Sequence, residues 1–209
     1  MVLAFGILEF AELEARGQST RVSMVERLQA KFRGDRAREI HVARANTGAA
    51  FVCPFVSSSP EVVRSMVDAA ELTERDIVVD LGCGDGSILL EASRRGLTGL
   101  SLTGIDIDPV LVATARRRLS EACCHVEILE QDIIDYDLSR ATVVFTFLVP
   151  NCMEALSTRL KTQLTTGSRI IAYKFGLPSQ DGWLIEKTWD VEDVIKSGGR
   201  ASVYLYLVH

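Results

Sequence analysis

The sequence lacks any run of about 18 consecutive apolar residues, the length that a membrane-spanning helix needs, although 47% of its 209 residues are hydrophobic. Its first residues are apolar without a preceding basic stretch, which disfavours a secretory signal peptide. The length suffices for one well-buried domain with an appendage but is short for two full domains. We therefore expect a single main domain and no transmembrane segment.

Cysteine and histidine are few and follow no ligand pattern. The 5 cysteines are an odd number without a C-x-x-C pair, and the 3 histidines are scattered. Neither a zinc site nor a disulfide framework fits this spacing, so we expect no metal and free thiols in a reducing compartment. Cys83 is interpreted as a small space-filling residue rather than a nucleophile, because no histidine is near it in the sequence.

An excess of positive charge is also missing. The chain carries 23 Lys and Arg against 28 Asp and Glu, a net charge of −5. Residues 1–60 hold 8 basic and 6 acidic side chains, which leaves 15 and 22 for the remainder, or +2 against −7. Because nucleic-acid affinity depends on neutralising phosphates, we expect no nucleic-acid partner. The basic stretch 27–44 indicates a solvated helix face, with an acidic partner or a targeting remnant as alternatives.

What the sequence does contain is a buried-strand pattern that ends in a glycine-rich turn. The apolar run 77–81 includes Asp80, and Gly82, Gly84 and Gly86 follow at alternate positions. Glycines without a Cβ let a ligand approach the backbone closely. The spacing differs from G-x-G-x-x-G, because Ser87 stands where the third glycine belongs, and no G-x-x-x-x-G-K-[ST] phosphate loop is present. The alternative is a glycine connection that binds nothing.

The rest of the chain alternates helix and strand patterns. Pro60, with Ser58 or Ser59 as its cap, begins a helix ahead of the first strand. Further strand-like runs stand at 102–106, 126–129, 142–147, 169–175, 183–189 and 201–208. The last two runs indicate an antiparallel hairpin. The order predicts an α/β, Rossmann-like, doubly wound sheet of seven mostly parallel strands, the last antiparallel, with helices on both faces.

Two carboxylates follow strands of this predicted sheet. Asp106 ends the second strand, 20 positions beyond Gly86, where a carboxylate can accept hydrogen bonds from both ribose hydroxyls of a nucleotide. Asp132 follows the third strand and is placed to accept from an adenine amino group, with Ile133 against the ring. An acidic loop without a ligand is the alternative for Asp132.

Four segments together resemble a known family. The turn resembles motif I of class I S-adenosylmethionine (SAM) methyltransferases, and about three quarters of the chain, from about Pro54 onward, is similar to the archaeal and mitochondrial protein lysine methyltransferases, which include the enzymes of ATP synthase subunit c and of the adenine nucleotide translocase. The segments that carry this resemblance are Pro54–Ser58, Asp80–Gly86, Phe147–Pro150 and Val203–Tyr206.

The resemblance implies SAM as the cofactor and assigns roles to several residues. Asp80 would order the loop, and Gly82, Gly84 and Gly86 would receive the methionine part of SAM, with Cys83 between them. Asp106 with Ile107 would bind the ribose, and Asp132 with Ile133 the adenine. The implied activity is methyl transfer to a lysine of a protein substrate. A small-molecule methyltransferase and a non-catalytic SAM-fold binding protein remain the alternatives.

A lysine acceptor sets a further requirement on the site. With a pKa of about 10.4, reaching the neutral amine at pH 7 costs about 4.6 kcal/mol, and an apolar channel lowers this cost by desolvation. Candidates for the channel are Phe55, Phe147, Pro150, Asn151 and Phe175, although the phenylalanines fit a core role as well. No general base is evident. The segment after the fourth strand lacks the [DNS]-P-P-[YF] of enzymes that methylate adenine or glutamine nitrogens.

The resemblance covers only part of the chain. We expect residues 1–53 to form an N-terminal helical extension and residues 54–209 the SAM-dependent methyltransferase domain. Because the opening segment shows no evident membrane anchor of the mitochondrial kind, we expect an intracellular, cytoplasmic rather than mitochondrial location. The sequence does not indicate the methyl acceptor or the oligomeric state.

Overall fold

The computed structural model describes residues 55–193 and 199–209. The helices predicted before residue 54 lie outside the described residues, and the boundary at residues 53 and 54 stays a prediction. The compact unit that contains the sheet spans Val56–His209. Among the described helices, none has the length and apolar character that crossing a bilayer requires.

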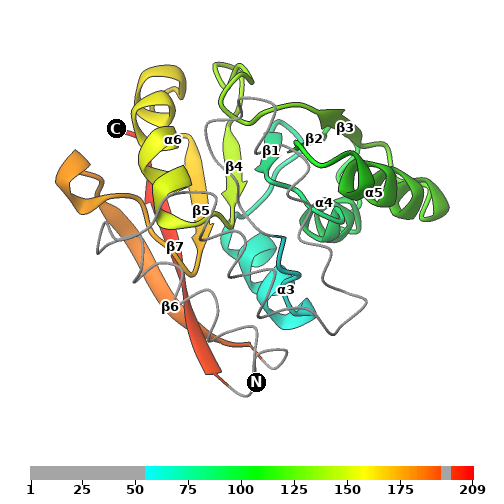
Figure 1. Ribbon diagram of the computed structural model, residues 1–209, viewed down its shortest axis with the longest axis horizontal. Coiled ribbons are helices and arrows are strands. Elements are labelled where there is room, and N and C mark those ends of the chain that lie inside the picture. The colour runs from blue at the N-terminus through cyan, green and yellow to red at the C-terminus, as the bar shows by residue number, and fades with distance from the viewer. Residues whose placement is uncertain (1–54, 194–198) are drawn as a thin grey trace, which may run out of the picture. The chain divides into compact units, whose positions relative to one another are not determined.

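A seven-stranded sheet forms the centre of the unit, in the order β3-β2-β1-β4-β5-β7-β6 (Figure 1). The strands are β1 (Ile77–Leu81), β2 (Ser101–Asp106), β3 (Glu127–Glu130), β4 (Val143–Thr146), β5 (Arg169–Tyr173), β6 (Ile185–Asp193) and β7 (Gly199–Leu207). The first five strands run parallel to one another, and β7 pairs antiparallel with both β5 and β6. The predicted doubly wound sheet with an antiparallel last strand is confirmed.

Helices connect the parallel strands. They are α3 (Pro60–Ala69), α4 (Ser87–Ser93), α5 (Pro109–Glu121) and α6 (Pro150–Gln163), with a short 3-10 turn at Ser179–Asp181. Two of them begin as the sequence predicts: Ser59 accepts a hydrogen bond from the backbone of Val62, and Asp108 accepts from Val110. A proline occupies the first turn of α3, α5 and α6, where its missing N–H leaves no helical bond unmade.

The terminal hairpin differs from its prediction at one strand. We expected strand residues 183–189, but β6 runs over Ile185–Asp193. Trp183 lies before the strand because its indole N–H donates to Ser157 of α6 and its ring packs edge-on against Tyr206. The strand continues to Asp193, where it pairs with Gly199 of β7.

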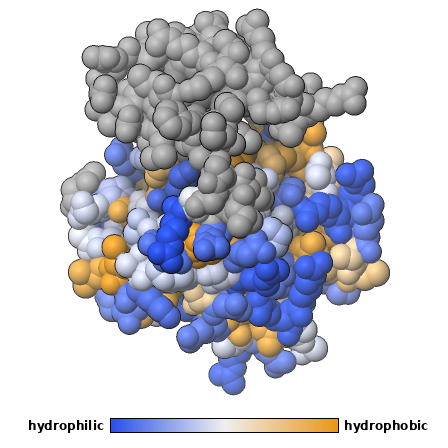
Figure 2. Space-filling model, turned by 90° about the horizontal axis from the view of Figure 1, so that it is seen from below, coloured by the Kyte–Doolittle hydropathy of each residue, from blue (hydrophilic) through white to orange (hydrophobic). Residues whose placement is uncertain are grey.

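The core separates into layers because alternate side chains of a strand point to opposite faces. Val143 and Phe145 of β4 belong to one buried cluster together with the apolar faces of α3, α4 and α5. Val144 lies between them and is fully buried, so it faces the opposite layer. Figure 1 shows α4 and α5 beside β2 and β3, and α6 beside β4 and β5. On the face in Figure 2, the described residues are mostly hydrophilic, and hydrophobic ones form small separate groups.

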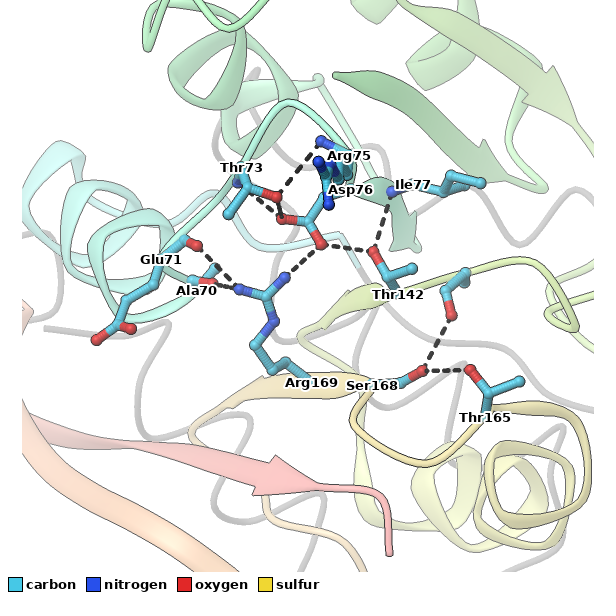
Figure 3. A network of polar contacts seen from close by, with 11 residues as sticks. Ala70, Glu71, Thr73, Arg75, Asp76, Ile77, Thr142, Thr165, Ser168 and Arg169 are labelled. Atoms are coloured by element: carbon cyan, nitrogen blue, oxygen red, sulfur yellow. Dashed lines mark hydrogen bonds and ion pairs between the residues drawn. The ribbon is translucent and has the colours of Figure 1, made fainter. Parts of the chain in front are cut away.

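A polar network joins the amino ends of three parallel strands (Figure 3). The Asp76 carboxylate accepts from the backbone and hydroxyl of Thr73 at 2.7 and 2.9 Å, and from the hydroxyl of Thr142 at 2.6 Å. Arg169 pairs with the same carboxylate and donates to the carbonyls of Ala70 and Glu71 after α3. The network thus lies at the amino ends of the strands, opposite the carboxyl edge where the glycine-rich turn follows β1.

Candidate functional site

The loops after β1, β2 and β3 meet at the carboxyl edge of the sheet, because these three strands are parallel neighbours. The glycine loop, defined as residues 82–86, connects β1 to α4. Its three glycines have φ angles of +75°, +54° and +77°, a region that strains residues with a Cβ. The Ile105 carbonyl of β2 accepts from Gly82 N at 2.9 Å and Cys83 N at 3.0 Å. The first half of the loop is therefore fixed to β2.

Asp106 lies directly against the glycine loop. Its Oδ2 accepts from Gly84 N at 2.9 Å, and its Oδ1 accepts from Asp108 N at 2.9 Å. Burial raises the pKa of this carboxyl, and the amide donors of Asp108 and Gly84 oppose the rise. The structure thus brings Asp106 into contact with the glycine loop, which ends 20 positions before it in the sequence.

Asp80, at the end of β1, is 5% exposed, and within the described part of the chain its carboxylate accepts no hydrogen bond. Burial, followed by the negative charges of Asp106 and Asp85, raises its pKa to about 8. The resemblance assigned the ordering of the loop to Asp80, whereas the hydrogen bonds that hold the loop come from Ile105 and Asp106. An unpaired buried carboxylate favours a cationic group beside it.

Cys83 belongs to the glycine loop and is buried, and burial together with Asp80 and Asp106 raises the pKa of its thiol. The thiol is therefore neutral, in agreement with its interpretation as a space-filling residue. The strand residue below it, Gly104, has no room for a side chain, because a Cβ there would lie 2.9 Å from Cys83 Sγ and 2.6 Å from Leu89 Cδ1. Sequence reasoning missed this glycine, although a lone glycine inside a strand is a known signal of close approach.

The segment after β3 turns toward Asp106, because Gln131 N donates to the Asp106 carbonyl at 3.0 Å. Asp132 follows at once, and its Oδ1 accepts from Ile134 N at 3.0 Å. Ile133 and Ile107 are both half-buried. The Asp132 carboxylate thus already accepts a hydrogen bond within its own turn. The contact between Asp132 and the adenine of SAM stays a prediction.

The predicted channel residues follow β4 and β5, which are adjacent strands. The ring of Phe147 meets Tyr173 edge-on, with centroids 4.7 Å apart. Phe175 lies two residues further along, and Pro150 and Asn151 open α6. The sequence did not single out Tyr173, which is fully buried. Phe55 is 45% exposed and precedes α3.

Arg118 of α5 also reaches the glycine loop, and sequence reasoning missed it. Its Nη1 donates to the Asp85 carbonyl at 3.0 Å and to Ser87 Oγ at 3.1 Å, and it pairs with Asp85 Oδ2 at 2.5 Å. Asp85 and Ser87 lie 33 and 31 positions before Arg118 in the sequence. The basic run on α5 gave no indication of which arginine would face the loop.

Comparison with known proteins adds to this geometry. The profile of the ANTKMT methyltransferase domain matches residues 80–182. A protein-lysine N-methyltransferase of Saccharolobus islandicus is 31% identical over 164 residues, which cover 74% of this chain and 93% of that protein. The chain belongs to the protein-lysine N-methyltransferase family. The residues 80–182 that match the ANTKMT methyltransferase profile include the glycine loop, Asp106 and the pair of Phe147 and Tyr173.

Two further relatives extend the comparison. The adenine nucleotide translocase lysine N-methyltransferase of Mus musculus is 29% identical over 158 residues, 75% of this chain but only 63% of that enzyme. A crystal structure of an RNA methyltransferase from Salinibacter ruber, in complex with S-adenosyl-L-homocysteine (SAH), is 33% identical with a TM-score of 0.65 and covers 73% of this chain and 94% of that one. The chain is a SAM-dependent methyltransferase with a Rossmann-like fold.

The residues at the carboxyl edge fit SAM. The loop glycines admit a ligand close to the backbone. The buried Asp80 carboxylate accepts no hydrogen bond from the described residues and suits a positively charged group, which SAM has in its sulfonium and ammonium. Asp106 ends β2, where the parallel nucleotide-binding sheet receives a ribose. These residues would hold the cofactor, which would supply the activated methyl group.

Proposed function

We propose that this enzyme transfers the methyl group of SAM to the side-chain amine of a lysine in a protein substrate. The observation that carries the proposal is the 31% identity to a protein-lysine N-methyltransferase over 93% of that protein's length. SAM supplies a methyl group activated by its sulfonium. The protein therefore has to bind both reactants, align the amine with the methyl and exclude water.

The aromatic pair supports a lysine acceptor. Phe147 is only partly buried and presents apolar surface after β4, backed by the edge-on ring of the fully buried Tyr173. Such surface disfavours the charged ammonium of a lysine and so lowers its pKa. An aromatic face also attracts the methylated, cationic product. Phe147 thus serves as a wall of the acceptor site. Asn151 follows it in the segment after β4, and Phe175 lies in the segment after β5.

RNA is the second candidate acceptor, because the Salinibacter ruber relative is described as an RNA methyltransferase. Two features favour protein over RNA. Residues 61–209 hold 15 basic against 22 acidic side chains, a poor balance for binding phosphates. The connection after β4 reads Phe147-Leu148-Val149-Pro150, which lacks the polar residue that begins the motif of adenine N-methylating enzymes.

Methyl-labelled SAM incubated with the purified enzyme and a cell lysate tests the proposal. We expect the label in the protein fraction, removed by protease and unaffected by ribonuclease, and recovered as methylated lysine after acid hydrolysis. Asp106→Ala serves as the matched control, since it removes the proposed ribose ligand. Label that ribonuclease removes would assign the acceptor to RNA instead, and label only in small molecules would reject both macromolecules.

A further inference from the structure

We infer that Arg118 is a positioning residue that holds the second half of the glycine loop together with the start of α4, residues 85–87, in the shape that binds SAM. The first half is fixed by β2 through the Ile105 carbonyl and the Asp106 carboxylate. The second half has no hydrogen bond to a strand among the described residues. Within that part of the chain, its long-range polar contacts all come from the guanidinium of Arg118.

The contacts of Arg118 converge on Asp85 and Ser87. One nitrogen of Arg118, Nη1, serves the backbone carbonyl of Asp85, its carboxylate and the Ser87 hydroxyl. The other Asp85 oxygen, Oδ1, accepts from the backbone and hydroxyl of Ser87 at 3.2 and 2.7 Å. Asp85 thus joins α5 to the first residue of α4.

The loop needs such a restraint because glycines lose more conformational freedom on ordering than other residues. Gly86 contributes by close packing: a Cβ there would lie 3.2 Å from Ala115 Cβ and from Leu119 Cδ1 of α5. The same helix therefore supports the loop through apolar contact and through Arg118. A loop that is ordered before binding loses less entropy when SAM arrives.

Arg118 also balances charge near the cofactor. Asp85 is one of the two charges that raise the pKa of Asp80 after burial, and the Arg118 guanidinium lies against the Asp85 carboxylate. The side chains of Arg118 and Asp85 are 34% and 26% exposed. Asp85 is the third carboxylate of the site, beside Asp80 and Asp106. Its ion pair with Arg118 offsets the negative charge that it adds.

The test compares Arg118→Met with wild-type enzyme in two measurements that require no methyl acceptor. Calorimetric titration should show the Kd for SAM raised roughly tenfold, the loss expected for one charge-assisted contact set. Hydrogen exchange of the free protein should show faster exchange at the amides of residues 85–87. In a third measurement, methyl transfer to a protein acceptor, kcat at saturating SAM should change less than about twofold, because the methyl-transfer geometry itself is not altered.

Arg116→Met is the matched control. Arg116 lies two positions away on α5 and donates through Nε and Nη2 to the Ile128 carbonyl of β3, so its loss weakens the same helix without touching the loop. We expect it to lower thermal stability while leaving the Kd for SAM and the loop exchange unchanged. Arg118→Lys should recover part of the SAM affinity, since it keeps the charge.

Two results would overturn the inference: equal shifts in Kd for Arg118→Met and Arg116→Met, or unchanged exchange at residues 85–87. If Arg118→Met does not fold, Asp85→Asn replaces it, and an unchanged Kd in that variant would overturn the inference as well. The test concerns cofactor binding alone. A wild-type enzyme that binds SAM but labels no protein would refute the lysine acceptor and leave this result standing.

Discussion

The Asp106 carboxylate binds two backbone amides and is also proposed to hold the ribose of SAM. We expect Asp106→Ala to raise the Kd for SAM by roughly tenfold or more, because both the loop contact and the ribose contact are lost. Calorimetry with SAH and its 2′-deoxy analogue separates the two effects. The missing hydroxyl should weaken binding to the wild type and have no effect on the variant; equal losses in both proteins would refute the ribose assignment.

The buried Asp80 makes the stability of the free enzyme depend on pH. Its pKa is raised from 3.8 to about 8, so between these values the folded protein holds a proton that the unfolded chain has released. The free energy of unfolding should therefore fall as the pH rises from about 4 to about 8, by at most about 1.4 kcal/mol per pH unit. The cause is burial, reinforced by Asp106 and Asp85.

The substitution Asp80→Asn removes this titration, because an amide carries no ionisable proton in this range. Urea unfolding of both proteins between about pH 4 and about pH 8 provides the measurement. As the pH rises, the wild type should lose stability relative to the variant, and below about pH 4 the difference between the two should no longer change. Parallel pH profiles for the two proteins would contradict the assignment of the proton to Asp80.

Among the structural elements, the amino ends of β1, β4 and β5 depend on the network around Asp76 (Figure 3). Burial raises the pKa of Asp76, but the donors from Thr142, Arg169 and Thr73 outweigh it, and the net shift is downward. Arg169→Met should lower the free energy of unfolding by roughly 3 kcal/mol at pH 7, because it leaves a buried carboxylate without its cation.

Acid should reduce that loss. The contribution of a carboxylate with a lowered pKa is present above about pH 4 and disappears as the pH falls through its folded value. Urea unfolding at pH 7 and pH 3 measures the difference. Arg95→Met is the control, because Arg95 pairs with the more exposed Asp68 and with Glu91 of α4 and its loss should cost less than about 1 kcal/mol. Equal losses for the two variants would show that the network adds nothing to an ordinary surface pair.

At the scale of the whole molecule, the sheet and its helices form the compact unit Val56–His209. We expect a fragment of residues 54–209 to unfold cooperatively and to bind SAM with a Kd within about threefold of the full chain, since the loop, Asp106 and Arg118 all lie in it. Circular dichroism and calorimetry provide the measurements. A fragment that aggregates or loses SAM affinity would place part of the cofactor site or core in residues 1–53.

The sequence predicted the succession of strands along the chain and much of the cofactor edge. The run 77–81 and the three glycines indicated β1 and its loop, and the prolines and caps at Ser59 and Asp108 indicated two helix starts. The prediction misplaced β6 because Trp183 belongs to a strand-like pattern and yet packs on α6 and Tyr206. Aromatic packing across elements has no signature within a single segment.

The sequence by itself determined what depends on neighbouring residues: which segments become strands and helices, where glycines allow positive φ, and that carboxylates end β1 and β2. Only the tertiary structure decided which distant groups meet, including Arg118 with Asp85, Arg169 with Asp76, and Cys83 over Gly104. The physical reason is that these contacts depend on the spatial order of strands and on the direction of side chains. Both are set by burial of the whole core rather than by local backbone preference.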